Sequence, residues 1–380
     1  MSKLEDLRTQ MNKINEQMLT LFKERMELSK KIAEEKAAAG KAIYDAVRER
    51  EVLDQITEQC DEEIDRFARR FFQQLFSLSK SYQTELLFKQ TAFTNKIQQA
   101  IASAPPLLPQ RGTAATAGIF GSNAQMACDK LLPLGKIHYV NSFRAVFEAV
   151  EQGLCEFGVL PIENSSNGSV KEVYDLLEEK KCYIVRATKQ WICHDLLANK
   201  GTKLEDIKVV YSHPQALGQC SHFLSTLPNV EIREYSNTAK AAEFVAQSKD
   251  NSIAAIAAPE CAALFDLTVL GKNIQNNDNN YTRFICITKD LTIYPGANKI
   301  SIVTSASHTP GGLGSLLGKF ADLGINLTKL ESRPIPGHNF EFLFYLDLEA
   351  TLLDPKVCAL FAELETSQEQ FRLLGNYLES

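Results

Sequence analysis

The sequence predicts a multidomain chain in which an all-helical segment, an α/β segment and an α+β segment follow one another. Apolar residues recur at helical spacing through the first hundred residues. A proline-rich stretch follows at residues 103–112, and strands then alternate with helices. The last eighty residues have the order βαββαβ, which is typical of a ferredoxin-like fold. A chain of 380 residues is long enough for two or three such domains.

The composition is that of an ordinary globular protein. Apolar residues make up 44% and charged residues 23%, and 41 basic against 47 acidic residues give a net charge of −6. This charge gives no reason to expect a nucleic acid or a membrane as partner. The N-terminus lacks the apolar core of a signal peptide, and nine scattered cysteines without a C-x-x-C pair favour free thiols. We therefore expect a cytoplasmic protein without a metal or cofactor.

The first segment is predicted to form one long amphipathic helix. Arg25 and Lys36 occupy positions about three turns apart in the apolar stripe of this helix, so both point the same way. Arg8 lies at the edge of this stripe. A cation at a core position needs an acidic partner or an anionic ligand. The apolar residues follow steps of three and four: Leu4, Leu7, Met11, Ile14, Met18, Leu21, Leu28 and Ile32.

A second helix is predicted to supply acidic residues. Gly40 ends the first helix, and the second runs from about Tyr44 to Cys60. Asp45 and Glu49 share the inward face of this helix, and Arg48 flanks them.

A third, long helix is predicted from about Glu62, and its apolar face also carries Ser79 and Gln83. Three helices thus turn basic, acidic and neutral polar side chains toward one core. These side chains form either buried structural ion pairs or a small site for an anionic ligand with hydroxyl and ether oxygens. Because a three-helix unit with one very long helix does not readily close alone, we expect a dimer.

The residue pattern of these helices resembles that of the all-helical chorismate mutases. It reads L-R, E-R-M-E-L, K-x-A-x-x-K, D-x-x-R-E-R and S-x-x-x-Q. In that family a Claisen rearrangement converts chorismate to prephenate. The resemblance implies that Arg8, from the partner subunit, and Arg25 hold the two carboxylates, and that Lys36 and Gln83 bind the ether oxygen. Four residues are implied on the ring-hydroxyl side: Asp45, Arg48, Glu49 and Ser79.

The register of the third helix stays open. The resemblance needs two extra residues before Ser79, and another register would give the roles of Ser79 and Gln83 to Ser81 and Glu85. A glutamate must be protonated to donate a hydrogen bond, so the register bears on pH behaviour.

Residues 113–292 are predicted to form a two-lobed α/β domain with mostly parallel strands. Ser142 caps a helix over residues 143–151, and Thr238 caps one that runs through Val245. The predicted strands are residues 114–120, 157–162, 182–192, 209–212, 252–258 and 282–288. Polar clusters stand at three strand boundaries: residues 163–166, residues 212–215 with Gln219, and residues 279–284. Singly, each cluster has an ordinary explanation as a cap or a solvated turn. Together, at strand ends, they indicate a site for a small polar molecule.

These clusters, I-E-N-S, Y-S-H-P-Q and N-Y-T-R-F, resemble those of prephenate dehydratase, whose fold is like that of two-lobed periplasmic binding proteins. That enzyme removes carbon dioxide and hydroxide from prephenate and needs no metal. The resemblance implies that Thr282 serves the leaving hydroxyl, that Arg283 helps to hold an anionic group, and that Glu163 organises the site. Three residues are implied to orient the ring: Asn164, Ser212 and Gln219.

One loop departs from the family pattern. The family usually reads G-P-x-G-T/S-F/Y-S, and residues 118–124 read G-I-F-G-S-N-A. Both glycines and Ser122 remain, whereas the proline, the aromatic residue and the last serine are replaced by Ile119, Asn123 and Ala124. The dehydratase rate or substrate preference is therefore open.

Residues 297–380 are predicted to form the βαββαβ unit. Its strands cover residues 299–305, 325–333, 340–348 and 371–378, and its helices end at Gly324 and span residues 355–364. Two stretches resemble the amino-acid-binding ACT domain, which binds phenylalanine in this enzyme family. The implied binding residues are Gly311, Gly312, Leu313, Gly314, Glu331, Ser332 and Arg333. A structural dimerisation module is the alternative.

The resemblance covers nearly the whole chain in order: a mutase domain at residues 1–102, a linker at 103–112, a dehydratase domain at 113–292 and an ACT domain at 297–380. This order is similar to that of the bifunctional chorismate mutase/prephenate dehydratases of phenylalanine biosynthesis. It implies chorismate and prephenate as substrates, inhibition by phenylalanine, and a homodimer with shared mutase sites or a higher oligomer. A mutase with a ligand-sensing module and a purely regulatory binding protein remain alternatives.

Overall fold

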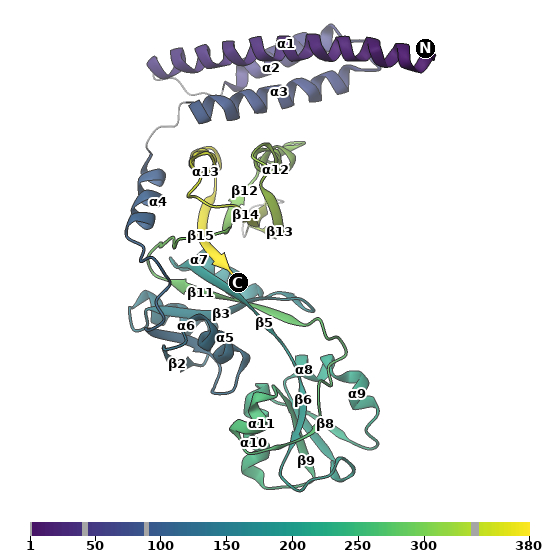
Figure 1. The fold of residues 1–380 in the computed structure, drawn as a ribbon, viewed down its shortest axis with the longest axis vertical. Helices are drawn as coiled ribbons and strands as arrows, with labels where there is room; N and C mark the ends of the chain where they lie inside the picture. Colours follow the sequence, from purple (N-terminus) through teal and green to yellow (C-terminus); the bar gives the residue numbers. More distant parts are fainter. Residues whose placement is uncertain (1, 40–44, 87–90, 336–341) are drawn as a thin grey trace. The chain divides into compact units, whose positions relative to one another are not determined.

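The computed structural model describes residues 2–39, 45–86, 91–335 and 342–380 (Figure 1). The chain divides into two compact units. The first unit contains residues 1–99 and 302–372, and the second contains residues 100–301 and 373–380. Within the described ranges, no helix is both long and apolar enough to cross a membrane.

The first unit begins with the three predicted helices. Helix α1 (Lys3–Ala38) starts with a capping box, in which the Ser2 hydroxyl accepts from the backbone N–H of Glu5 and the Glu5 carboxylate accepts from the N–H of Ser2. Helices α2 (Ala46–Glu58) and α3 (Asp65–Leu86) follow. Helix α3 contacts both α1 and α2.

An additional helix, α4 (Ala92–Ala102), is not predicted by the apolar periodicity. The hydroxyl of Thr91 accepts from the backbone N–H of Thr94 at 3.1 Å, which starts this helix with a cap of its own. The boundaries predicted at Gly40 and Tyr44 lie outside the described residues.

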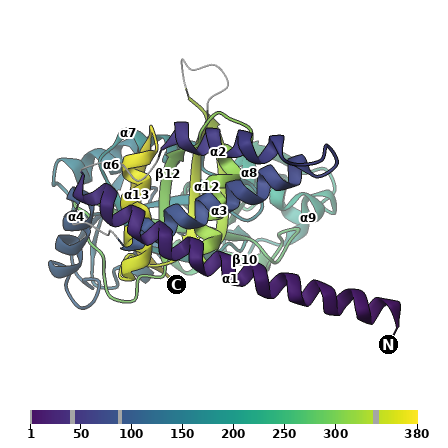
Figure 2. The ribbon, with the colours of Figure 1, turned by 90° about the horizontal axis from the view of Figure 1, so that it is seen from above.

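The apolar stripe of α1 is exposed. Figure 2 shows the N-terminal part of α1 extending beyond α2 and α3. Only Ser29 and Ala33 of α1 are buried. The stripe residues have exposed fractions of 46–64%: Leu4, Leu7, Met11, Ile14, Met18, Leu21, Leu28 and Ile32. Most of the apolar face of this helix is therefore uncovered in a single chain.

The C-terminal elements have the predicted order βαββαβ. Strands β13 and β14 pair antiparallel, and β12 lies on the other side of β14. Within the first unit, α3 also contacts α12 and α13. The elements are β12 (Lys299–Ser305), α12 (Gly312–Asp322), β13 (Asn326–Pro334), β14 (Phe342–Glu349), α13 (Pro355–Ser367) and β15 (Phe371–Glu379). The division between the two units falls within β12 and within β15.

The second unit has two lobes, and the sheet of the first lobe runs in the order β15-β5-β11-β3-β1-β2. Strand β3 pairs in parallel with β1, whereas β11 pairs antiparallel with both β3 and β5. The sheet is thus mixed and not mostly parallel as predicted, because β11 returns between β3 and β5. The elements of this lobe are β1 (Thr113–Ala117), α5 (Asn123–Leu131), β2 (Lys136–Val140), α6 (Phe143–Glu151), β3 (Phe157–Asn164), β4 (Gly168–Ser169), α7 (Lys171–Glu179), β5 (Tyr183–Trp191) and β11 (Tyr281–Thr288).

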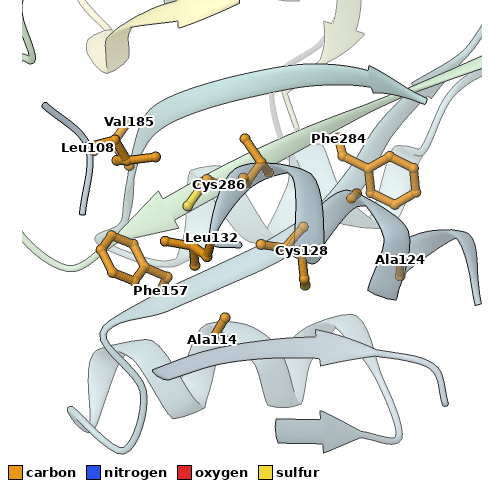
Figure 3. Packing of buried hydrophobic residues seen from close by; sticks show 12 residues of the cluster. Leu108, Ala114, Ala124, Cys128, Leu132, Phe157, Val185, Phe284 and Cys286 are labelled. Atoms are coloured by element: carbon orange, nitrogen blue, oxygen red, sulfur yellow. The ribbon is translucent and has the colours of Figure 1, made fainter. Parts of the chain in front are cut away.

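The core of the first lobe lies between α5 and this sheet. Cys128 of α5 packs in one cluster with Phe157 of β3 and with Phe284 and Cys286 of β11 (Figure 3). Burial raises the pKa of Cys128 to about 12, so its thiol stays protonated at neutral pH. This cysteine is a core residue and not a nucleophile.

The second lobe is a sheet between two helical layers. The sheet runs β10-β6-β9-β7-β8. Alternate residues of β9 enter different clusters: Ala254 and Ile256 pack on the side of α8 and α9, and Ala255 and Ala257 on the side of α10 and α11 (Figure 1). The elements are β6 (Asp195–Ala198), β7 (Val209–Ser212), α8 (Pro214–Gln219), α9 (Ser221–Ser225), β8 (Glu231–Glu234), α10 (Thr238–Ser248), β9 (Ile253–Ala257), α11 (Glu260–Leu264) and β10 (Thr268–Gly271).

One predicted helix cap is confirmed and one is wrong. Ser142 caps α6, and its hydroxyl accepts from the backbone N–H of Ala145 at 3.2 Å. The cap of α10 is Asn237 and not Thr238, because the extended backbone of Asn237 brings its side-chain oxygen to the first N–H groups of the helix. Thr238 is the first helical residue.

Candidate active sites

Arg25 connects α1 to α3. Its Nη1 donates to the hydroxyl of Ser79 and, at 3.3 Å, to the carbonyl of Leu75. The guanidinium also lies 5.5 Å from the centre of the Phe76 ring. Burial lowers the pKa of Arg25. These partners of Arg25 are all neutral, so they do not compensate its positive charge. A half-buried cation of this kind is suited to bind an anion.

Two residues of α3 face the same side as this contact. Ser79 is 4% exposed and Gln83 is 8% exposed, and their spacing of four residues puts them one above the other. The Oε1 atom of Gln83 is buried and has no hydrogen-bond partner among the described residues. A buried amide oxygen without a partner is typical of a position that a ligand completes.

Ser81 lies on a different face of α3. With Tyr82 it lines a pocket of about 180 Å³ against α12 and α13, where Lys319 and Glu363 form an ion pair. This placement favours the register with Ser79 and Gln83 in the site. The side chain of Glu85 lies outside the described residues.

The predicted residues of α2 are only partly brought to this cluster. Glu49 is half-buried and forms an ion pair with Lys80 of α3 at 3.0 Å. Asp45 instead caps α2, with its carboxylate accepting from the backbone N–H of Arg48 at 3.0 Å. The Arg48 side chain is exposed and pairs with Glu51 at 3.1 Å. In a single chain, Asp45 and Arg48 therefore serve α2 itself.

Lys36 and Arg8 lie on opposite sides of Arg25 along α1. Lys36 is half-buried in the last turn of α1. Arg8 is exposed. At 1.5 Å per residue, Arg8 is about 25 Å from Arg25 along the axis. One straight helix cannot bring both arginines to the same small ligand, so Arg8 does not belong to the cluster of its own chain.

A pocket of about 450 Å³ lies between the two lobes of the second unit. Gln219 of α8 borders it, together with residues from the loop after β3 and the segment before β11. Every side chain around it that carries a functional group is an amide or a hydroxyl. The lining residues are Ser166, Asn167, Pro214, Gln215, Gly218, Gln219, Gln275, Asn276, Asn277 and Asn280. Such a lining suits a polar ligand.

Asn164 and Thr282 lie next to each other at the ends of paired strands. The Nδ2 atom of Asn164 donates to Thr282 Oγ1 at 2.9 Å and to Asn280 Oδ1 at 2.9 Å. Gln219 Oε1 in turn accepts from Asn280 Nδ2 at 3.1 Å and lies 3.1 Å from His194 Nε2. The structure thus joins three predicted site residues through Asn280. His194 was missed, since a lone histidine before a buried strand carries no motif.

The remaining predicted dehydratase residues have other contacts. Ser212 is fully buried, and its hydroxyl donates to the carbonyl of Ile256 at 2.6 Å. Arg283 is 7% exposed and forms an ion pair with Glu379 of β15 at 2.5 Å and with Glu163 at 3.6 Å. Burial alone raises the pKa of Glu379, but the charges of Arg283 and Lys299 hold it below its usual value. Because successive strand residues face opposite sides, Arg283 points away from Thr282.

The altered loop at residues 118–124 is held by local packing. Gly121 has a φ of +84°, and a Cβ there would lie 2.6 Å from Leu264 Cδ2. Ser122 caps α5, and its hydroxyl accepts from Gln125 N–H at 3.4 Å. Ala124 is buried in the core. Gly121, Ser122 and Ala124 are therefore explained by local packing, whereas Ile119 and Asn123 are the two altered residues of this loop that are partly exposed.

The two C-terminal stretches fall on separate elements. Residues 311–314 form the start of α12, and Gly312 has no room for a side chain because a Cβ would overlap the carbonyl of Ser307. Glu331 and Arg333 on β13 pair with each other at 3.1 Å. Ser332, between them, is exposed. Leu313 is half-buried in the first turn of α12.

Comparison with known proteins identifies the families that two segments of the chain match. A family model described as chorismate mutase type II matches residues 7–84, and one described as prephenate dehydratase matches residues 114–292. The arogenate dehydratase/prephenate dehydratase 2 of Arabidopsis thaliana is 35% identical over 312 residues, which cover 79% of this chain and 80% of the relative. The prephenate dehydratase of Arthrobacter aurescens, solved in complex with L-Phe, has a TM-score of 0.64 and 30% identity over 70% of this chain and 89% of that one.

One relative spans both matched segments. The bifunctional chorismate mutase/prephenate dehydratase of Escherichia coli (strain K12) is 31% identical over 379 residues, which cover 98% of this chain and 95% of the relative. The helical cluster around Arg25 and the amide-lined pocket lie within the two family matches. This chain therefore belongs to the bifunctional chorismate mutase/prephenate dehydratase family.

Proposed function

We propose that this chain converts chorismate to prephenate at the helical cluster and prephenate to phenylpyruvate at the pocket between the lobes, as part of phenylalanine biosynthesis. The observation that carries this proposal is the match to the bifunctional enzyme of Escherichia coli, which is named for the same two activities and covers 98% of this chain. The proposed organisation is a mutase domain at residues 1–102, a linker at 103–112, a dehydratase domain at 113–292 and a regulatory domain at 297–380.

The first reaction is a pericyclic rearrangement that needs no nucleophile and no proton transfer. The enzyme holds the compact conformer of chorismate and stabilises the negative charge that grows on the breaking ether oxygen. Arg25, already fixed by Ser79, is suited to bind a carboxylate. The NH₂ group of Gln83 and the ammonium group of Lys36 are suited to donate to the ether oxygen, and Glu49 of α2 contacts α3 through its ion pair with Lys80.

A second copy of the chain completes the mutase site in this proposal. Arg8 is too far from Arg25 of its own helix to share a ligand with it. The apolar stripe of α1 is exposed over most of its length, which a partner helix would cover. We therefore assign Arg8 to the site of the partner subunit, in a homodimer that is also compatible with a higher oligomer.

The second reaction removes a carboxylate and a hydroxide from prephenate together. The step needs a hydrogen-bond donor at the leaving hydroxyl. Thr282 is suited to this role, since Asn164 donates to its oxygen and leaves the O–H to donate. Gln219 borders the pocket and is suited to orient the substrate. We assign structural roles to Ser212 and Arg283. The Ser212 hydroxyl already donates to the carbonyl of Ile256, and the Arg283 guanidinium already pairs with Glu379.

Regulation by phenylalanine is proposed for the C-terminal βαββαβ unit. The fold order is that of an amino-acid-binding ACT domain, and the Arthrobacter aurescens relative was solved with L-Phe. The candidate ligand residues are Gly311, Gly312, Leu313, Gly314, Glu331, Ser332 and Arg333. Inhibition requires that phenylalanine bind a less active state better than the active one.

The first experiment gives the purified protein prephenate alone and measures phenylpyruvate with and without phenylalanine. Formation that phenylalanine suppresses supports the dehydratase and regulatory assignments together. A sample that still converts chorismate but forms no phenylpyruvate is a mutase with a ligand-sensing module. Because the Arabidopsis thaliana relative is also named an arogenate dehydratase, arogenate is tested beside prephenate as the second candidate substrate.

A further inference from the structure

Two backbone groups fix the orientation of the Asn164 amide. Asn164 Oδ1 lies 3.0 Å from the backbone N of Ser166 and 3.0 Å from that of Asn167. Backbone N–H groups only donate, so the atom that faces them must be the oxygen. The NH₂ group of Asn164 therefore points the other way, toward Asn280 and Thr282.

This orientation propagates to the next two amides. Because Asn164 Nδ2 donates to Asn280 at 2.9 Å, the atom of Asn280 that it contacts must be Oδ1. Asn280 then presents its NH₂ to Gln219 at 3.1 Å, so the receiving atom of Gln219 must be Oε1. The Gln219 NH₂ makes no hydrogen bond to the described part of the chain, and Gln219 borders the pocket.

The last member of the chain is His194. Its Nε2 lies 3.1 Å from Gln219 Oε1, an atom that only accepts, so Nε2 must carry the proton. His194 is 3% exposed, and its Nδ1 is buried without a hydrogen-bond partner among the described residues. A buried lone pair without a partner is tolerated more easily than a buried N–H without one. The environment of Nδ1 therefore also favours the tautomer with the proton on Nε2. Burial also lowers the pKa of His194 and keeps the ring neutral.

We propose that His194 is a positioning residue of the dehydratase site, which holds the Gln219 amide with its NH₂ toward the substrate. Two donors act on Gln219 Oε1 from inside the protein, His194 Nε2 and Asn280 Nδ2. If the amide flipped, its NH₂ would face both of them and an acceptor would face the pocket. At the other end of the chain, Thr282 accepts from Asn164, which leaves its O–H as a donor.

At these two positions the site therefore presents donors, Gln219 NH₂ and Thr282 O–H, to oxygen atoms of the substrate. This inference rests on the dehydratase function proposed above. It predicts recognition of substrate carboxylate, carbonyl or hydroxyl oxygens at these two points.

The test compares two substitutions in the full-length protein. His194→Gln keeps an NH₂ close to the position of Nε2, whereas His194→Leu removes the donor. We expect His194→Leu to lower kcat/KM for prephenate by about ten- to hundredfold, the usual effect of leaving a buried polar group unpaired. His194→Gln should stay within about threefold of the wild type. The rate with chorismate serves as an internal control, and neither substitution should change it.

A double-substitution cycle separates positioning from a general loss of structure. If His194 acts only through Gln219, then His194→Leu should cost no further dehydratase activity in a Gln219→Ala background. Equal losses in His194→Gln and His194→Leu, or additive losses in the cycle, overturn the proposal.

The tautomer gives a readout that does not depend on activity. In protein with ¹⁵N-labelled histidine, the histidine signal that is lost in His194→Gln should be that of a ring with a protonated Nε2 and an unprotonated Nδ1. An Nδ1–H tautomer overturns the proposal even if His194→Leu fails to fold. A wild-type protein that shows the expected tautomer but forms no product from prephenate or arogenate refutes the proposed function and not the hydrogen-bond network.

Discussion

Arg25 is the single residue on which the mutase activity should depend most directly. It is half-buried, and its neutral partners on α3 do not cancel its charge. We expect Arg25→Ala to lower kcat/KM for chorismate by about a hundredfold or more, because the substrate carboxylate loses the cation that holds it in the compact conformer. The rate with prephenate should not change. Arg70→Ala, at an exposed arginine of α3, is the matched control, and both rates are measured by absorbance.

Thr282 should show the opposite pattern. Its hydroxyl accepts from Asn164 and has its proton free for the leaving group. We expect Thr282→Ala to lower the dehydratase rate by about a hundredfold or more without changing the mutase rate. Thr282→Ser, which keeps the hydroxyl, should retain most of the activity. If either Arg25→Ala or Thr282→Ala loses both activities while folded, the two sites are not independent.

His194 should make the stability of the dehydratase unit depend on pH. Burial lowers its pKa below the usual 6.5, and the weaker effects of the Gln219 hydrogen bond and the Asp195 charge act in the opposite direction. Between the lowered pKa and about 6.5, the unfolded chain binds a proton that the folded chain does not, so the free energy of unfolding falls as the pH falls. Above that window this contribution is constant.

Urea unfolding at several pH values checks this prediction. The fluorescence of Trp191, the only tryptophan, reports on β5 within the same unit. His194→Gln should lose the part of the pH dependence that falls below about 6.5. An unchanged pH profile in this variant means that His194 does not titrate differently in the folded protein.

At the residue scale, the sequence predicts the site residues that stand in motifs. Asn164, Gln219 and Thr282 belong to short polar clusters, and the structure joins them through hydrogen bonds. Arg283 belongs to the same motif as Thr282, yet the alternation of β11 turns it toward Glu379. His194 has no polar neighbours in the sequence, and only the packing of β6 against α8 reveals its role. A motif thus identifies a site but does not show which of its members face it.

Strand β15 is tied to the second unit by a buried cluster of charges. The Glu379 carboxylate forms ion pairs with Arg283 and with Lys299, each at 2.5 Å, and its side chain is only 11% exposed. Removing the carboxylate leaves two buried cations without it. We expect Glu379→Ala to lower the free energy of unfolding by about 3 kcal/mol, since breaking a buried ion pair costs more than its formation gains.

The fluorescence of Trp191 in urea follows this loss as well, because β5 pairs with β15. Glu234→Ala, at an exposed glutamate of β8, is the matched control and should leave the urea midpoint unchanged. An unfolding midpoint of Glu379→Ala equal to that of the wild type would show that the cluster contributes no net stability.

At the element scale, periodicity predicts where a helix or strand lies but not what it pairs with. Helix α6 and strands β7 and β12 have the predicted bounds, because Ser142, Ser212 and the apolar run at residues 299–305 mark them locally. The antiparallel direction of β11 depends on a return from the second lobe, which no local pattern encodes. The choice of Asn237 over Thr238 as a cap depends in the same way on backbone geometry.

At the scale of the whole molecule, the order of the family matches is readable from the sequence because each motif is local. A contribution from another subunit is not local. It is inferred from two facts together, the axial separation of Arg8 from Arg25 and the uncovered stripe of α1. The proposed dimer therefore makes a prediction that no single-chain site makes.

Mixing two inactive variants should restore mutase activity. In a dimer of one Arg8→Ala chain and one Arg25→Ala chain, the site built on the Arg8→Ala chain has its own Arg25 and receives an intact Arg8 from its partner. The other site lacks both arginines. Random exchange of subunits puts half of the chains in mixed dimers, each with one working site of two, so the mixture should reach about a quarter of the wild-type rate.

The control mixture pairs Arg25→Ala with Lys36→Ala, two residues that the proposal places on the same chain. No mixed dimer of these variants contains an intact site, so the mixture should stay as inactive as its components. If the mixture of Arg8→Ala and Arg25→Ala also stays inactive after subunit exchange has been verified, Arg8 does not act across the dimer. Recovery in that mixture and not in the control would assign Arg8 to the partner's site, since only a residue supplied by the other chain is restored by exchange.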